Sequence, residues 1–573
     1  MVCRSRFVEI RMLSTTRAPF ALLICLLLVC PMPLAQAAGP VAPNAGAILQ
    51  QLQPGLPAGV ADADAHLTVQ EKPVAAVPPS IAFRVTTIQI TGNTSIATNQ
   101  LHALVKDAEG QDLTLAALSE VVARITEHYR RQGFPLARAI VPSQTMVAGV
   151  LQVQVIEARY DAVVLVNQTA VGDALLRSAL VELQRGQVIQ QAPLDQALLS
   201  LSDIPGVVVN ATMKPGSHLG ATDVEVTATA SGKGLSGNSV IDNYGNAYVG
   251  HTRVSQSLRV IDPFNRQTGA ALDLQGLSAG PGLSYGRVAY ETVLSGAVTR
   301  VGGAYSALRY VVGGPLAASG SHGDAQVGQL WARRSLLRSY TANLYAQVQY
   351  DNTQLRDHVG AAIDNNRHTD KITTSLSGDV HDWLWLGAVN YWSLSLTNGV
   401  VSAENAATSA DASHPQGRFS KLSGNLSRLQ KLNPSDSLFG SLSMQWASHN
   451  LDPSEKMAVG GASSVRAVNA SALSGDAGAL LNLEYRHSLG AAWGGLWQLT
   501  AFMDSATVQI NKTPLGSHDN RVQVNGTGIG LAWSGPQQFS VKAQLAKSLG
   551  TLPASLAGMT GSVRGWLEIA HAF

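Results

Sequence analysis

Apolar and polar residues alternate one by one through most of the second half of the chain. Every second residue is apolar in 343–350, in 481–486 and in 497–504. A period of two is typical of β-strands that have one apolar and one polar face. Turn residues separate segments of this kind from about residue 233 onward, and we expect sixteen strands, the first over 234–244 and the last over 564–573.

Two architectures produce this alternation, a large soluble β-sandwich and a transmembrane β-barrel. A barrel has an apolar wall toward lipid, a polar lumen and no open edge. The last strand favours the barrel, because Leu567, Ile569 and the terminal Phe573 all point to one side of it. The predicted fold is therefore mostly β, with a 16-stranded antiparallel transmembrane β-barrel over 231–573.

Two smaller units of similar plan precede this region. In 81–157 a strand is followed by a helix over 114–133, whose apolar residues recur at helical spacing, and then by two strands. Residues 158–230 repeat the order as strand, two helices and two strands. The chain therefore contains an internal repeat of two β-α-α-β-β units.

The amino terminus has the features of a secretory signal peptide over residues 1–37. Four arginines precede an apolar stretch at 21–30 and a small-x-small cleavage site at 35–37. Its removal leaves 36 Lys and Arg against 37 Asp and Glu, and it takes away all three cysteines, Cys3, Cys25 and Cys30. Disulfides and thiolate metal sites are thereby excluded in the mature chain, and no charge excess points to nucleic acid.

A short helix and a linker are expected between the signal and the first unit. Residues 38–57 contain a helix candidate with Asn44 as its cap and Pro54 as its stop, and 58–80 is a linker with several prolines. A helix of this length is marginal in isolation, so a disordered mature terminus is an alternative.

No pattern of catalysis or metal binding emerges. The fourteen histidines form no His-Glu-x-x-His motif, and no G-x-S-x-G elbow is present. The glycines at 460–461 are not followed by a lysine at the spacing of a phosphate-binding loop. We expect no enzyme activity, no catalytic residue, no metal and no cofactor.

Several segments together resemble the TpsB transporters of two-partner secretion, relatives of the filamentous-haemagglutinin and haemolysin transporters. These segments cover both units, the start of the barrel and two later stretches: 125–144, 194–216, 242–250, 337–357 and 454–470 with 502–508. The resemblance implies that 81–157 and 158–230 are POTRA domains and that the helix within 38–57 is a plug.

The resemblance also implies a site inside the barrel. In this family a long loop, here 454–474, folds into the lumen and presents an arginine to an aspartate on the wall. The matching residues are Arg466 and Asp504, with a loop motif of Gly460, Gly461, Ser464 and Val465. A guanidinium fork and a carboxylate form charge-assisted hydrogen bonds that can fix such a loop. Ala467 and Val468 replace the family's usual glycine and aromatic residue.

The function that the resemblance implies is export across the bacterial outer membrane without ATP. The expected partner is a secreted TpsA-type exoprotein, such as a haemagglutinin, haemolysin or adhesin, which binds surfaces within 81–230 and which the transporter could also activate. Other expected partners are outer-membrane lipid and lipopolysaccharide, the barrel-assembly machinery and periplasmic chaperones. The alternatives are a barrel-assembly insertase of the same superfamily, a passive porin and a barrel phospholipase.

Overall fold

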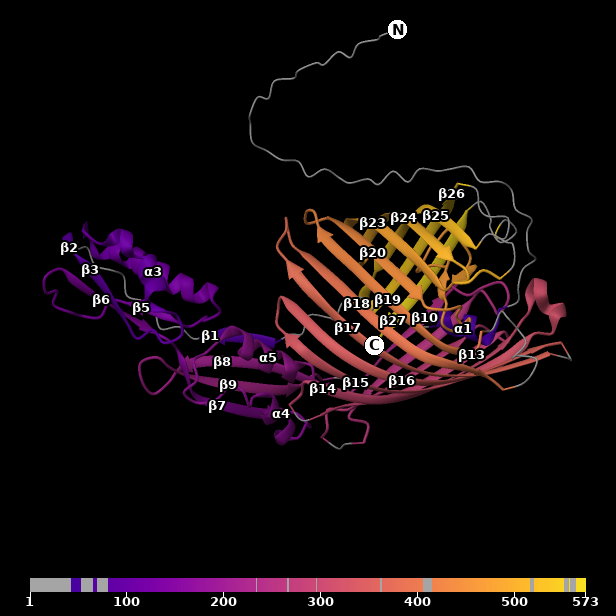
Figure 1. Ribbon diagram of the computed structural model, residues 1–573, viewed down its shortest axis with the longest axis horizontal. Helices are drawn as coiled ribbons and strands as arrows, with labels where there is room; N and C mark the ends of the chain where they lie inside the picture. The colour runs from indigo at the N-terminus through magenta and orange to yellow at the C-terminus, as the bar shows by residue number, and fades with distance from the viewer. Residues whose placement is uncertain are drawn as a thin grey trace, which may run out of the picture.

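The computed structural model places two small units at one end of a large barrel (Figure 1). It describes residues 43–52, 65–69, 81–232, 234–264, 267–294, 296–360, 363–404, 415–515, 520–550, 556 and 563–573. The expected signal peptide lies outside these residues and stays a prediction. No helix within the described ranges is long and apolar enough to cross a membrane.

The first unit packs a three-stranded sheet against a long helix. Strand β3 (Thr87–Thr91) pairs in parallel with β6 (Val150–Ile156), which pairs antiparallel with β5 (Arg138–Ile140). Helix α3 (Leu115–Arg131) covers the sheet with its apolar face, and Thr114 caps its first turn. The shorter elements are β2 (Phe83–Val85), α2 (Thr98–Ala103), η1 (Lys106–Ala108) and β4 (Gln111–Leu113).

The second unit repeats this topology and lies against the barrel. Strand β7 (Arg159–Gln168) pairs in parallel with β9 (Ala221–Ala230), which pairs antiparallel with β8 (Val207–Pro215). Helices α4 (Asp173–Ala179) and α5 (Gln191–Ser202) cover the sheet. Asp203, directly after α5, accepts two hydrogen bonds of 2.8 Å from Arg338 at the barrel rim. The unit is therefore held at one mouth of the barrel.

A fourth strand in the second unit comes from the expected linker. Strand β1 (Ala65–Val69) pairs in parallel with β8 and forms one edge of the sheet, whose order is β1-β8-β9-β7. Sequence reasoning treated 58–80 as a linker without a fold of its own. The five residues become a strand because β8 supplies a row of backbone hydrogen-bonding groups that an isolated chain lacks.

Within the described residues, sixteen antiparallel strands close into a barrel in chain order, which confirms the predicted fold class. They are β10 (Leu235–Asp242), β11 (Arg253–Ile261), β12 (Ala271–Ser278), β13 (Leu283–Val293), β14 (Thr299–Val311), β15 (His322–Arg338), β16 (Ala342–Val359), β17 (Ile363–Asp382), β18 (Ala388–Ala403), β19 (Gly417–Lys431), β20 (Asp436–Ala447), β23 (Ala477–Ala492), β24 (Gly495–Gln509), β25 (Arg521–Ser534), β26 (Phe539–Leu549) and β27 (Arg564–Ala572).

The two faces of the wall differ as the alternation predicts. Leu330, Val348 and Ile372 are each more than half exposed on the outer face. Charged residues such as Asp351 and Arg367 lie on the inner face and are at most 2% exposed. The wall thus presents apolar side chains to lipid and polar ones to the lumen.

Two segments fill much of the lumen, a helix from the amino-terminal region and a loop from the wall. Helix α1 (Ala45–Gln51) is capped by Asn44, whose side chain accepts a hydrogen bond from the Ala47 N–H. Ala45 and Ile48 are fully buried against apolar residues of β13 to β16. Figure 1 shows α1 inside the barrel, far in space from the units that follow it in the chain.

Candidate functional site

The loop between β20 and β23 folds back into the barrel. It contains a short hairpin of β21 (Met457–Val459) and β22 (Leu473–Gly475). Val459, Val465 and Val468 are fully buried, and they pack with apolar residues of β24 and β25. An apolar inner patch on β24 and β25 therefore binds this part of the loop, as a separate apolar patch on β13 to β16 binds α1.

The tip of the loop depends on two glycines that sequence reasoning selected. Gly460 and Gly461 have φ angles of 108° and 102°, which L side chains rarely adopt. A Cβ on Gly460 would lie 2.1 Å from the Asn469 carbonyl oxygen. The Gly460 N–H donates to the Ser464 hydroxyl at 3.1 Å. These contacts turn the chain so that residue 466 points at the wall.

Arg466 reaches Asp504 of β24 at the bottom of this turn. Its Nη2 and Nε donate to the two oxygens of the Asp504 carboxylate at 2.6 and 2.9 Å, and its backbone N–H donates to the same carboxylate at 3.0 Å. Arg466 is 3% exposed and Asp504 is fully buried. The geometry is the bidentate fork in which an arginine fixes a carboxylate most strongly.

Three more wall residues complete the surroundings of Arg466, and sequence reasoning assigned a role to none of them. Glu484 of β23 accepts a hydrogen bond from Nη1 at 2.6 Å. The Phe502 ring lies 3.5 Å from the guanidinium carbon. The indole N–H of Trp566, on the last strand, donates to the Arg466 carbonyl at 2.8 Å. The sequence could have indicated all three residues, because the alternation identifies their strands and places each of them on the side that faces the lumen.

The residues that depart from the family pattern fit the wall. The Ala467 side chain packs with Phe502 and Ala546, and Gly526 leaves the space for it: a Cβ on Gly526 would lie 2.6 Å from that of Ala467. Val468 joins the buried apolar cluster. The aromatic contact at the tip therefore comes from Phe502 of the wall and not from position 468 of the loop.

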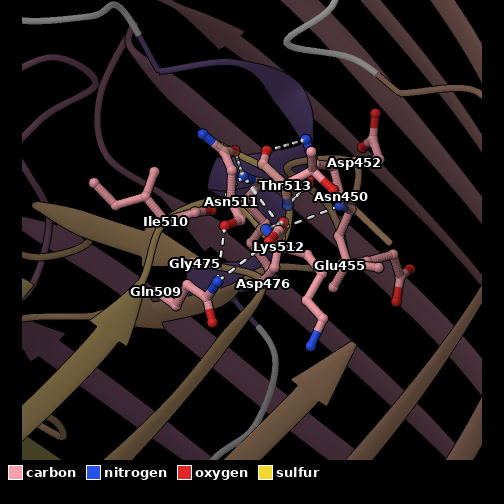
Figure 2. Close-up of polar contacts among 12 residues, drawn as sticks. Asn450, Asp452, Glu455, Gly475, Asp476, Gln509, Ile510, Asn511, Lys512 and Thr513 are labelled. Carbon is pink, nitrogen blue, oxygen red and sulfur yellow. Dashed lines mark hydrogen bonds and ion pairs between the residues drawn. The ribbon is translucent and has the colours of Figure 1, made fainter. Parts of the chain in front are cut away.

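A second set of ion pairs holds the loop where it enters the lumen, and sequence reasoning missed it. Glu455 lies between Lys371 of β17 and Lys421 of β19, at 2.5 and 2.7 Å. Lys456 pairs with Asp476 at 3.2 Å. Figure 2 shows Asp476 surrounded by the chain around Lys512, whose N–H donates to it at 2.7 Å. The two limbs of the loop are thus fixed to the wall and to the turn after β24.

The same entry region contacts α1. Ser454 faces Gly46, where a Cβ would lie 2.7 Å from the Ser454 nitrogen. The Gln50 side chain donates a hydrogen bond to the Ser454 carbonyl. The helix and the loop therefore occupy the lumen as neighbours in direct contact.

The remaining residues selected from the sequence lie on the outside of the barrel. Leu567, Ile569 and Phe573 are between 38% and 45% exposed on the outer face of β27, which pairs with both β26 and β10 and closes the cylinder. His571, on the same face, stacks with Phe539 at a centroid distance of 4.2 Å. In the part of the chain that the structure describes, no group of three His, Asp or Glu side chains could hold a metal ion.

A closed wall, a lumen filled by a helix and a loop, and soluble units at the periplasmic mouth define a transporter barrel of the outer membrane. The model of the ShlB-type POTRA domain matches residues 83–158. The model of the haemolysin secretion/activation protein ShlB/FhaC/HecB matches residues 220–533, more than half of the chain, and the chain belongs to this family. It is an outer-membrane transporter of two-partner secretion, with its POTRA units in the periplasm.

Individual relatives agree with this assignment. The chain is 25% identical over 482 residues to the heme/hemopexin transporter protein HuxB of Haemophilus influenzae (strain 86-028NP). The aligned region covers 82% of this chain and 84% of HuxB. It is 23% identical over 518 residues to the outer membrane transporter CdiB of Escherichia coli O6:K15:H31, with 84% and 82% covered. The solved structure of CdiB from Escherichia coli has the same fold, with a TM-score of 0.68 at 20% identity over 91% of this chain and 93% of that chain.

Proposed function

We propose that this transporter exports an unfolded exoprotein through its own barrel after α1 leaves the lumen. The observation that carries the proposal is the position of α1, which fills part of a closed cylinder and is held there by side-chain packing and a few hydrogen bonds. A segment bound in this way can leave without breaking the barrel. Folding of the exoprotein at the cell surface supplies the direction of transport, and no step uses ATP.

The exoprotein docks on the POTRA units within 81–230, largely through backbone pairing with a sheet edge. The pairing of β1 with β8 supports this mode, because an extended segment already occupies one edge of the second sheet. In the first unit, β3 and β5 form the edges of the sheet. Backbone pairing requires little sequence specificity, so individual partner-binding residues are not assigned.

Arg466 and Asp504, with Gly460, Gly461, Ser464 and Val465, keep the loop seated at rest. The fork between the two charged residues is buried, and the glycines set the direction of the tip. A seated loop narrows the lumen and shields its apolar patch from water. Movement of the tip is then one of the steps that open the path.

The exported partner is of the TpsA type, a haemagglutinin, haemolysin or adhesin, and the match to the haemolysin secretion/activation family supports this class of cargo. The apolar outer wall contacts lipid, and lipopolysaccharide in the outer leaflet. The barrel-assembly machinery recognises the closing strand through Leu567, Ile569 and Phe573. Periplasmic chaperones deliver the unfolded chain to this machinery. The transporter itself performs no catalytic step.

Deletion of 81–229 tests the proposal. We expect export of a co-expressed exoprotein to stop while a heat-modifiable barrel remains in the outer membrane. The readout is the exoprotein in the culture medium, measured beside the full-length transporter at equal barrel abundance. Normal export by the deleted chain would contradict docking on the POTRA units.

A further inference from the structure

One arginine lies between the anchor of the plug helix and the anchor of the loop. Arg367 of β17 is 1% exposed, and its Nη2 donates to Asp357 of β16 at 2.8 Å. Its Nε lies 2.9 Å from the carboxylate of Asp452, at the entry of the loop. Neither Nε nor Nη1 has a hydrogen-bond partner in the described part of the chain, so Arg367 and Asp452 are joined as an ion pair and not by an aligned hydrogen bond. The two carboxylates therefore determine where this guanidinium lies.

Each carboxylate also holds one of the two lumen segments directly. Asp357 accepts the first N–H of α1, from Ala45, at 2.7 Å, and the Tyr310 hydroxyl at 2.6 Å. Asp452 accepts the N–H and the hydroxyl of Ser454 at 2.9 and 2.7 Å. Ser454 is the residue that faces Gly46 and Gln50 of α1. The helix, the wall and the loop thus form one continuous polar chain that passes through Arg367.

The charges in this network of polar contacts make the positions of the helix, the wall residues and the loop depend on one another. Asp357 and Asp452 both form an ion pair with Arg367, so removing Arg367 would take the ion-pair partner from two buried carboxylates at once. Removing the loop would take Asp452 away and leave Arg367 with one partner, in a lumen now open to water. Loss of α1 would likewise strip a donor from Asp357 and change its hold on Arg367.

We propose that Arg367 couples α1 to the inward-folded loop, so that displacement of either segment weakens the hold on the other. Arg367 is a positioning residue, which acts through Asp357 and Asp452. Because the coupling acts on the departure of α1, it rests on the proposed function. Its consequence is that the lumen opens as a unit once either segment is disturbed.

The test uses cysteine reporters, because all cysteines of the chain precede residue 38. Ala47→Cys reports departure of α1 and Val459→Cys reports displacement of the loop, each through its rate of labelling by a bulky maleimide in the full chain. The nearly isosteric Asp452→Asn weakens the polar contacts between Arg367 and the loop. We expect it to speed labelling at residue 47 about fivefold or more with Arg367 present, and less than about twofold in an Arg367→Gln background.

The reverse experiment starts from the helix. Ala45→Pro removes the N–H that Asp357 accepts, at a first helical position where proline is tolerated. It should speed labelling at residue 459 when Arg367 is present and have much less effect in Arg367→Gln. Arg253→Gln is the matched control, because the pair of Arg253 with Asp242 joins β10 to β11 and involves neither segment. In this background the effects of Asp452→Asn and Ala45→Pro should match those in the parent.

The outcomes separate the two proposals. If Asp452→Asn and Ala45→Pro increased the labelling rates by the same factor with and without Arg367, the coupling would be overturned. The departure of α1 would be unaffected by that result. Absence of labelling at residue 47 during active export would contradict departure of α1, and the coupling with it. Heat-modifiability of each variant establishes that its barrel is folded.

Discussion

At the scale of single residues, Arg466 contacts three strands of the wall. Its side chain binds Asp504 of β24 and Glu484 of β23, and its carbonyl accepts a hydrogen bond from Trp566 of β27. The contacts with Asp504 and Trp566 are buried, and breaking one side of a buried ion pair typically costs about 3–5 kcal/mol. The tip therefore has one well-defined seat.

Replacing Arg466 with Ala should impair export far more than membrane insertion. Asp504 and Glu484 lose their shared cation, so the tip loses the free energy that seats it. The measurement compares exoprotein in the medium with the amount of heat-modifiable barrel. Arg486→Ala is the control, because Arg486 also pairs with Glu484 but does not contact the tip. Equal export by both variants would contradict a role for the seated tip.

Glu157 gives the first POTRA unit a predictable pH dependence. Burial acts to raise the pKa of this carboxyl, but hydrogen bonds from Thr94 and Ser95 outweigh it and lower the pKa to about 2. A lowered pKa means that the stabilisation is present above the ordinary value of 4.5 and is lost as the pH falls toward 2. The shift corresponds to about 3 kcal/mol at neutral pH.

Hydrogen exchange of α3 checks this, because Tyr129 of α3 donates to Glu157 at 2.8 Å. After correction for intrinsic rates, protection of α3 should fall between pH 4.5 and 2 in the full chain. In Glu157→Gln it should already be lower at pH 7 and change little in that window. The exposed Glu127→Gln should behave like the parent, and a flat profile in the parent would contradict the assignment.

At the scale of elements, β1 protects an edge that would otherwise be open. Replacing 65–69 with alternating Gly and Ser should remove this strand, since glycine weakens strands. The amides of β8 should then exchange about tenfold faster, and an amino-terminal fragment of the exoprotein should bind severalfold tighter. The same replacement at 70–74 is the control. Unchanged exchange in β8 would show that β1 does not cover it.

Most strands could be predicted because the wall has lipid on one side and a polar lumen on the other, which imposes a period of two on the sequence. The sequence pattern also predicted a strand near 247–260, and this was wrong for 247–252, which precede β11. The strands predicted near 340–351 and 370–381 missed the outer ends of β16 and β17, where a high share of polar residues weakens the alternation. Strand β1 was out of reach because its partner β8 is more than a hundred residues away.

The site was predictable in part for a related reason. Asp504 lies in a clearly alternating strand, so its lumen orientation follows from parity, and the resemblance supplied Arg466. Parity cannot say which loop residue meets which wall residue. Arg367, Asp357 and Asp452 therefore remained unassigned, although the first two lie in β17 and β16.

At the scale of the whole molecule, the lumen is closed by segments from distant parts of the chain. Removing 38–53 should raise the single-channel conductance in planar bilayers, because α1 excludes ions from the space it fills. The full-length chain in the same bilayer is the reference, and both barrels should be heat-modifiable. An unchanged conductance would remove the role of α1 as a plug.

The hydrogen bond from Trp566 has a consequence for the order of barrel biogenesis. Trp566 belongs to β27, the last of the sixteen described barrel strands in chain order, which pairs with β10 at the seam. A sheet without β27 lacks this donor, so the tip acquires its full set of contacts only after β23 to β27 have come together. Seating of the tip is thus a step that follows assembly of this side of the barrel.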